Sequence, residues 1–191
     1  MKPTRAAIVV SLCLLLIVFT AHAQTPNTKH FDKDGLSFDY PSEWALDDKS
    51  NSDLQQLTLT RADSDAQIGI FVHRGKVDTP EKMAKAKAAF IDPYIKATSD
   101  NFVQMGATKP EQTAASTEIG GAKAEGERLR TSLGGESAEA TIYWLTLGNH
   151  VVLLNFFSPN TSIKIATPAW DIVRNSIHVE EAKPAPKPTP K

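Results

Sequence analysis

Residues 138–158, AEATIYWLTLGNHVVLLNFFS, decide the fold. Two runs rich in β-branched and aromatic residues, 141–147 and 151–157, flank Gly148-Asn149. A two-residue loop with glycine first predicts a β-hairpin with a type II′ turn. This loop sets the register, and the pairs predicted to face each other are Leu147 with His150, Leu145 with Val152, Trp144 with Leu153 and Tyr143 with Leu154.

Both faces of this hairpin are apolar. Side chains alternate along a strand, so one face carries Ile142, Trp144, Val151, Leu153 and Phe157, and the other carries Tyr143, Leu145, Leu147, Val152, Leu154 and Phe156. A sheet with one face in water would carry polar residues on that face. The sequence therefore predicts the centre of a sheet that is covered on both faces, with helices as the cover.

Alternating apolar and polar residues predict further strands of an antiparallel sheet. In Phe31–Tyr40, apolar residues alternate with polar ones from Leu36 onward, and Pro41 ends the ladder because proline cannot donate to it. One further strand is predicted to begin at Trp44, and another contains Leu57 and Leu59. The remaining predicted strands cover residues 67–73, 112–119, 122–132 and 138–147. Residues 122–132 are polar, which favours a place near the edge of the sheet.

Two Thr-Pro pairs predict helix starts, with threonine as the cap and proline in the first helical position. The pairs are Thr79-Pro80 and Thr167-Pro168. The second helix is expected to bury Trp170, Val173 and Ile177. The first is expected to be amphipathic, with an apolar stripe of Met83, Ala86, Phe90, Tyr94, Ala97 and Phe102.

Pro93 interrupts that first helical pattern. An interior proline removes a backbone hydrogen bond and clashes with the preceding turn. We expect either a kink at Pro93, or a break near Ile91 and a new helix capped by Asp92. Gly106 is the predicted end of the helical segment.

Residues 1–23 have the pattern of a secretory signal peptide. Lys2 and Arg5 precede a nearly unbroken apolar run, and Ala21-His22-Ala23 predicts cleavage after Ala23. A membrane anchor is the alternative, but the run is shorter than the roughly 20 residues that a spanning helix needs. We therefore expect a periplasmic or secreted protein with no stable membrane insertion after the signal is removed.

The composition of the exported chain predicts three segments and excludes cysteine chemistry and strong attraction to nucleic acid. Residues 24–30 are predicted to be a flexible lead, 31–179 one domain, and 180–191 a disordered tail rich in lysine and proline. The one cysteine, Cys13, lies in the signal, which excludes disulfides and thiolate chemistry from the exported chain. A net charge of −1 gives no strong field for nucleic acid. We expect a monomer.

Two segments resemble a known family. Gly35-Leu36-Ser37-Phe38-Asp39-Tyr40-Pro41, followed by Trp44, resembles the opening strand and turn of PsbP-like domains. The run from Trp170 to Val179 is similar to their last helix and the short strand after it. Bacterial exported proteins of the DcrB type are similar. The resemblance implies an α+β fold, an α/β/α sandwich with an antiparallel sheet of about six strands. It carries no metal-binding or docking residue over to this chain.

Candidate site residues are few. His30, Asp32 and Asp34 form the densest group of metal-ligand types, with a solvated polar segment as the alternative, and no cofactor is expected. His73 is a candidate contact for a ligand or partner. Trp44 and Tyr143 are candidates for ligand stacking, with burial in the core as the alternative.

Catalytic signatures are missing from the sequence. It contains no Gly-x-Ser-x-Gly, Ser-x-x-Lys or His-Glu-x-x-His pattern. Our first hypothesis is therefore a non-catalytic accessory or interaction domain of the cell envelope, with an envelope or secreted protein as its partner. The alternatives are a carrier that holds a small ligand between sheet and helix, and a hydrolytic enzyme.

Overall fold

The computed structural model describes residues 27–181. The predicted signal peptide, its cleavage site after Ala23 and the tail from residue 182 lie outside the described residues. The strands are β1 (Thr28–Lys33), β2 (Leu36–Pro41), β3 (Ala45–Asp48), β4 (Leu54–Arg61), β5 (Ser64–Lys76), β6 (Glu111–Ile119), β7 (Ala122–Leu133), β8 (Glu136–Leu147), β9 (His150–Pro159) and β10 (His178–Val179). The helical elements are α1 (Pro80–Ala86), η1 (Lys87–Ile91), α2 (Asp92–Gln104) and α3 (Ile163–Ser176).

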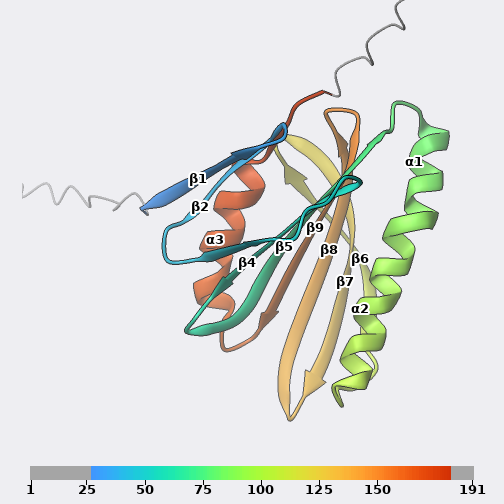
Figure 1. Ribbon diagram of the computed structural model, residues 1–191. Helices are drawn as coiled ribbons and strands as arrows, with labels where there is room; N and C mark the ends of the chain where they lie inside the picture. The colour runs from blue at the N-terminus through green and yellow to red at the C-terminus, as the bar shows by residue number, and fades with distance from the viewer. Residues whose placement is uncertain (1–26, 182–191) are drawn as a thin grey trace, which may run out of the picture.

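A seven-stranded antiparallel sheet, in the order β3-β4-β5-β9-β8-β7-β6, forms the centre of the molecule (Figure 1). The predicted register of the β8–β9 hairpin is confirmed, with Trp144 opposite Leu153. The predicted turn type is wrong: Gly148 and Asn149 both have positive φ, 56° and 64°. Positive φ at both central positions defines a type I′ turn, and asparagine tolerates that region better than most residues.

Both faces of the β8–β9 hairpin are buried, as the sequence predicted. One face packs against α3 and β2, in a cluster that includes Tyr143 and Trp170. The other packs against the α1–η1–α2 segment, in a cluster that includes Trp144 and Ile95. Figure 1 shows these helical elements on opposite sides of the sheet. The α+β sandwich is therefore confirmed, although its main sheet has seven strands instead of about six.

The segment Thr28–Pro41 is a hairpin and not the single strand Phe31–Tyr40 that alternation predicted. Asp34 and Gly35, with φ of 53° and 79°, form the turn. β1 and β2 pair across it, and β10 joins β2 to make a second, three-stranded sheet. The predicted lead at 24–30 is corrected too, because β1 begins at Thr28 and residues 28–30 belong to it.

The helical segment after β5 accommodates Pro93 by a π-helical turn. Its start is confirmed, since the Lys82 N–H donates to the Thr79 hydroxyl. The chain then stays helical through η1, where the Asp92 N–H donates to the carbonyl of Lys87, five residues earlier. The predicted restart capped by Asp92 is wrong, because Ile91 and Asp92 both keep right-handed helical dihedrals.

The π turn also changes which side chains face the sheet. A π turn holds more residues than an α turn, so Ala86 and Ile91 both face the core although they lie five positions apart. A regular 3.6-residue period placed Phe90 and Ala97 on the buried stripe instead. The structure corrects this, with Phe90 45% exposed and Ala97 also exposed.

α3 begins earlier than the Thr167-Pro168 pair predicted. Ser162 occupies the position before the helix, and Pro168 lies inside it. The Thr167 hydroxyl donates to the carbonyl of Ile163 at 2.8 Å, so it does not cap the helix. Ala166 in the first turn is fully buried, and its packing favours the longer helix. No helix within residues 27–181 has the length and hydropathy that crossing a membrane requires.

Candidate functional site

The two aromatic candidates lie in the core. Trp44 is 1% exposed. The ring of Tyr143 stacks on that of Trp170 with centroids 5.7 Å apart, and Phe156 stacks on the same indole at 5.3 Å. Burial raises the pKa of Tyr143. These rings fill the space between the sheet and α3, so the structure assigns them to packing instead of ligand stacking.

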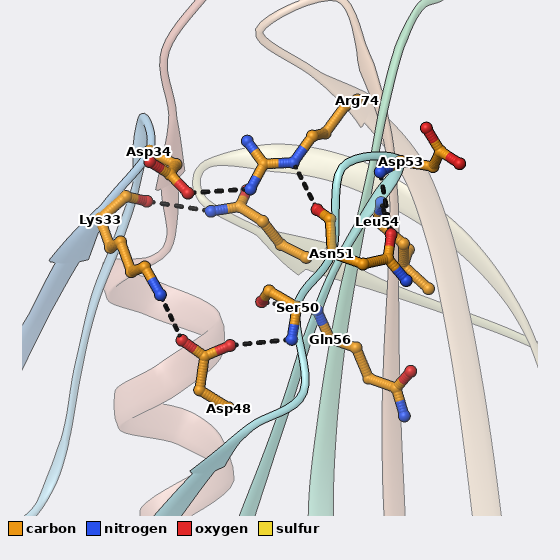
Figure 2. Close-up of polar contacts among 10 residues, drawn as sticks. Lys33, Asp34, Asp48, Ser50, Asn51, Asp53, Leu54, Gln56 and Arg74 are labelled. Atoms are coloured by element: carbon orange, nitrogen blue, oxygen red, sulfur yellow. Dashed lines mark hydrogen bonds and ion pairs between the residues drawn. The ribbon is translucent and has the colours of Figure 1, made fainter.

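The three candidate metal ligands are not brought together. His30 Nδ1 lies 2.7 Å from the carboxylate of Asp39 across the β1–β2 hairpin. Asp34 accepts a hydrogen bond from Arg74 at 2.8 Å, as Figure 2 shows, and Asp32 is exposed. Within residues 27–181 no group of three or more His, Cys, Asp or Glu side chains could hold a metal ion.

His73 lines an open groove of about 880 Å³ between β5 and the α1–η1 segment. Its ring stacks on that of Phe90 at 4.0 Å, and burial lowers the pKa of the imidazole. The Arg74 guanidinium closes one rim by donating to the carbonyl of Asn51 at 3.2 Å, beside its contact with Asp34 (Figure 2). On the other rim, Lys76 and Lys82 both pair with Asp78.

A second groove, here called the sheet–helix groove, runs between α2 and the end of the sheet where β5 and β8 begin. Its cavity volume is about 930 Å³, near the upper end of the range for small-molecule pockets. Its apolar walls come from both layers, with Phe102 and Met105 from the α2 end, Leu133 from β7, and Ala138, Ala140 and Phe157 from β8 and β9.

A pair of polar side chains lies at the inner end of the sheet–helix groove. Asn155 is in the middle of β9, and its Nδ2 donates to the hydroxyl of Tyr94 in the first turn of α2 at 3.1 Å. The Tyr94 ring is held edge-on by Phe71, with centroids 5.1 Å apart. The Oδ1 of Asn155 is buried and has no hydrogen-bond partner within the described part of the chain. Leaving a buried acceptor unpaired costs about 1–3 kcal/mol.

The charges of the sheet–helix groove are acidic and lie at its mouth. Asp65 and Glu136 are its charged lining residues, from the first residues of β5 and β8. Glu136 already accepts hydrogen bonds from Thr161. Burial raises the pKa of Tyr94, so its phenol keeps its proton at neutral pH. The inner end of the groove is therefore polar but uncharged.

Comparison with solved structures identifies the fold. The structure of PsbP from the cyanobacterium Synechocystis superposes with a TM-score of 0.51 at 14% identity, covering 83% of this chain and 95% of that one. The chain has a PsbP-like fold. A protein from Bacteroides thetaiotaomicron matches with a TM-score of 0.49 at 16% identity, over 80% of this chain and 48% of that one.

LpqN, described as involved in cell envelope biogenesis of Mycobacterium tuberculosis, matches with a TM-score of 0.45. It is 12% identical, over 80% of this chain and 89% of that one. No family model matches the sequence, and no curated protein does. The likeness to PsbP at this identity concerns the fold alone.

Sequence reasoning missed the polar pair of this PsbP-like domain. Asn155 interrupts the apolar run 151–157. Its position lies on the same face of the strand as Val151 and Leu153, the face that is covered by the α1–η1–α2 segment. A polar residue at such a core-facing position is the signal that could have identified it. Its lack of a partner depends on the three-dimensional arrangement and could not be read from the chain.

The histidines of the described chain form no triad in either groove. The lining of the sheet–helix groove contains hydroxyl groups but no histidine. Near His73, the Ser52 hydroxyl donates to Asp53 at 3.3 Å. His150 Nδ1 contacts the backbone carbonyl of His73 at 3.0 Å and no nucleophile.

Proposed function

We propose that this protein is an exported, non-catalytic binding domain whose ligand site is the sheet–helix groove. The observation that carries the proposal is the groove itself, a cavity of about 930 Å³ whose walls are apolar side chains from α2 and from the sheet, with the hydrogen-bonded pair Asn155 and Tyr94 among its lining residues. Small-molecule sites are typically concave and mostly apolar, with a few polar groups that fix the orientation of the ligand.

Export and an accessory role belong to the same proposal. The signal pattern of residues 1–23 supports export to the periplasm or beyond the cell. Met105 and Leu133, which are 57% and 39% exposed, flank the open side of the groove and could contact an envelope partner that delivers or receives the ligand. The carrier hypothesis is thus favoured among the alternatives, and hydrolysis is not.

The proposal is tested with N-phenyl-1-naphthylamine, a neutral dye that fluoresces in apolar sites. We expect saturable binding by the protein lacking residues 1–23. Asn101 lines the groove from the exposed side of α2, so Asn101→Trp should fill the groove and weaken dye binding by about tenfold or more.

Ala97→Trp is the matched control, because Ala97 lies on the same helix, is exposed and does not line the groove. This variant should bind the dye as the parent protein does. Equal binding by the parent and by Asn101→Trp would exclude the groove as the site. Circular dichroism of both variants checks that the fold is retained.

A further inference from the structure

We propose that the sheet–helix groove binds amphipathic cations: elongated apolar molecules with one ammonium group, which stays in water at the mouth while the apolar chain lies along the groove. This inference rests on the proposed function of the groove and names the chemical class of its ligand. Three features support it: two uncompensated carboxylates at the mouth, the carboxyl end of α2 at the same groove, and an apolar interior without charge.

The carboxylates at the mouth have no cationic partner. Asp65 and Glu136 line the groove from the first residues of β5 and β8, the two strands that flank β9. Glu136 accepts hydrogen bonds from Thr161, which is neutral. Arg61, in the strand before β5, is paired with Asp63. Within residues 27–181, both groove carboxylates are therefore left without an ion pair and attract a cation from solution.

The carboxyl end of α2 adds to this negative potential. The end of a helix carries a partial negative charge of about half an elementary charge, and α2 ends at Gln104, which lines the groove together with Met105. The last turn of α2 contains no basic residue that would offset this charge. Lysine, arginine and histidine are also missing from the lining of the groove, as far as the structure describes it. An ammonium group at the mouth is attracted by all of these charges, and a carboxylate is repelled.

The interior of the groove accommodates an apolar chain but not a charge. Ala138 and Ala140 line the groove from β8, and their short side chains leave space beside Phe102 of α2. At the inner end, Tyr94 and Asn155 are uncharged. An ammonium group buried there would lose its hydration without gaining a compensating charge, which is strongly unfavourable. The ligand therefore binds with its apolar chain inward and its cationic head at the mouth.

The inference is tested by displacing N-phenyl-1-naphthylamine at pH 7.5 and low salt with three competitors of equal chain length: decylammonium, 1-decanol and decanoate. Each exposed ion pair contributes little by itself. We therefore expect decylammonium to displace the dye at concentrations about threefold lower than 1-decanol and about tenfold lower than decanoate.

The double variant Asp65→Asn/Glu136→Gln removes both charges from the mouth and keeps the amide oxygen that can accept from Thr161. It should raise the concentration of decylammonium needed for displacement by about threefold or more. It should leave that of 1-decanol unchanged, because the apolar walls are untouched. Asp65→Asn alone provides a second readout if the change at Glu136 disturbs the fold.

Glu118→Gln/Glu125→Gln is the matched control, with the same change in net charge. Both residues are exposed, on β6 and β7, and neither lines the groove. Glu125 lies opposite Trp144, toward the end of β8 that is away from Glu136. This variant should keep the advantage of decylammonium over both competitors.

Salt provides a readout that needs no variant. The attraction of a head group at the open mouth is screened by ions in solution. Raising the NaCl concentration from about 20 mM to about 500 mM should therefore remove most of the advantage of decylammonium over 1-decanol. An advantage that does not change with salt would place the ammonium group inside the protein and contradict the inference.

The outcomes separate this inference from the proposed function. If Asn101→Trp impairs dye binding but decylammonium has no advantage over 1-decanol, the groove is a binding site and the preference for cations is wrong. The same conclusion follows if the advantage survives in Asp65→Asn/Glu136→Gln or falls equally in the control. If Asn101→Trp binds the dye as the parent does, the proposed site fails, and the preference for cations fails with it.

Discussion

Gly126 shows how one missing side chain shapes this sheet. It lies on β7 directly opposite Tyr143 of β8. A Cβ atom built at Gly126 would be 2.5 Å from Cδ1 of the tyrosine ring and 2.8 Å from the carbonyl oxygen of Ile142. The ring of Tyr143 lies over this glycine and stacks on Trp170 from there. A larger residue at position 126 would displace the whole aromatic stack.

We therefore predict that Gly126→Ala lowers the free energy of unfolding by about 1–3 kcal/mol, the usual range for overpacking. Urea titration followed by circular dichroism measures this loss. Gly75→Ala is the control, because a Cβ at Gly75 would meet nothing within 4 Å. Equal stabilities of the two variants would contradict the close approach of the tyrosine ring.

Asp48 carries the most strongly shifted carboxyl group in the loop region of Figure 2. The Lys33 ammonium donates to its Oδ2 at 2.7 Å and the Ser50 N–H to its Oδ1 at 3.0 Å (Figure 2). These hydrogen bonds, that of Lys33 first, lower the pKa of Asp48 to about 2. An unfolded aspartate has a pKa of about 3.9.

The carboxylate therefore stabilises the fold fully above about pH 4, and this contribution is lost as the pH falls toward 2. We predict that Asp48→Asn destabilises the protein at pH 7 by about 0.5–1 kcal/mol, a value limited by solvent around the pair. The difference from the parent should shrink as the pH drops below 4. Urea titrations at several pH values test this, and a difference independent of pH would contradict it.

At the scale of elements, the π turn decides which residue of the helical segment belongs to the core. Ile91 is fully buried against the sheet, and Phe90 beside it is 45% exposed. We predict that Ile91→Ala lowers the free energy of unfolding by about 2–4 kcal/mol. Phe90→Ala should cost less than about 1 kcal/mol. Denaturant titration compares the two variants. A larger loss for Phe90→Ala than for Ile91→Ala would contradict the π turn and indicate a regular α-helix.

The same element shows why sequence patterns predicted only part of the fold. The β8–β9 register followed from the sequence because the two-residue loop Gly148-Asn149 fixes which residues of the two strands face each other. The alternation of Leu36 and Phe38 revealed β2 but not β1, whose side chains are mostly exposed. The regular 3.6-residue period assumed for the helical segment does not hold through the π turn, so Phe90 and Ala97 were wrongly placed on its buried side.

The candidate site was predictable only in outline. A ligand between sheet and helix was one of the hypotheses, and the groove lies in that interlayer space. Asn155 and Tyr94 come from segments far apart in the chain, so their contact depends on how α2 packs on β9. His73, Trp44 and Tyr143 were chosen by residue type, and residue type does not distinguish a buried ring from an accessible one.

At the scale of the whole molecule, stability should be graded from the centre of the main sheet outward. β5, β9 and β8 each pair on both sides, and the two helical layers cover β8 and β9. β1 pairs on one side only and is mostly exposed. We predict that amide hydrogens exchange slowest in β9 and β8 and fastest in β1 and β3. Hydrogen exchange followed by mass spectrometry measures this order, and a β1 as protected as β9 would contradict it.

The second sheet joins the two ends of the described chain. Val179 of β10 pairs with Leu36 of β2, and the Glu180 N–H donates to the carbonyl of Gly35 at 2.8 Å, a contact that moves Glu180 out of the predicted tail. The edge of β2 that pairs with β10 therefore stays without its partner strand until residues 178–180 have been synthesised. Such distant pairings form slowly, so the three-stranded sheet is completed only after nearly all of the described chain has left the ribosome.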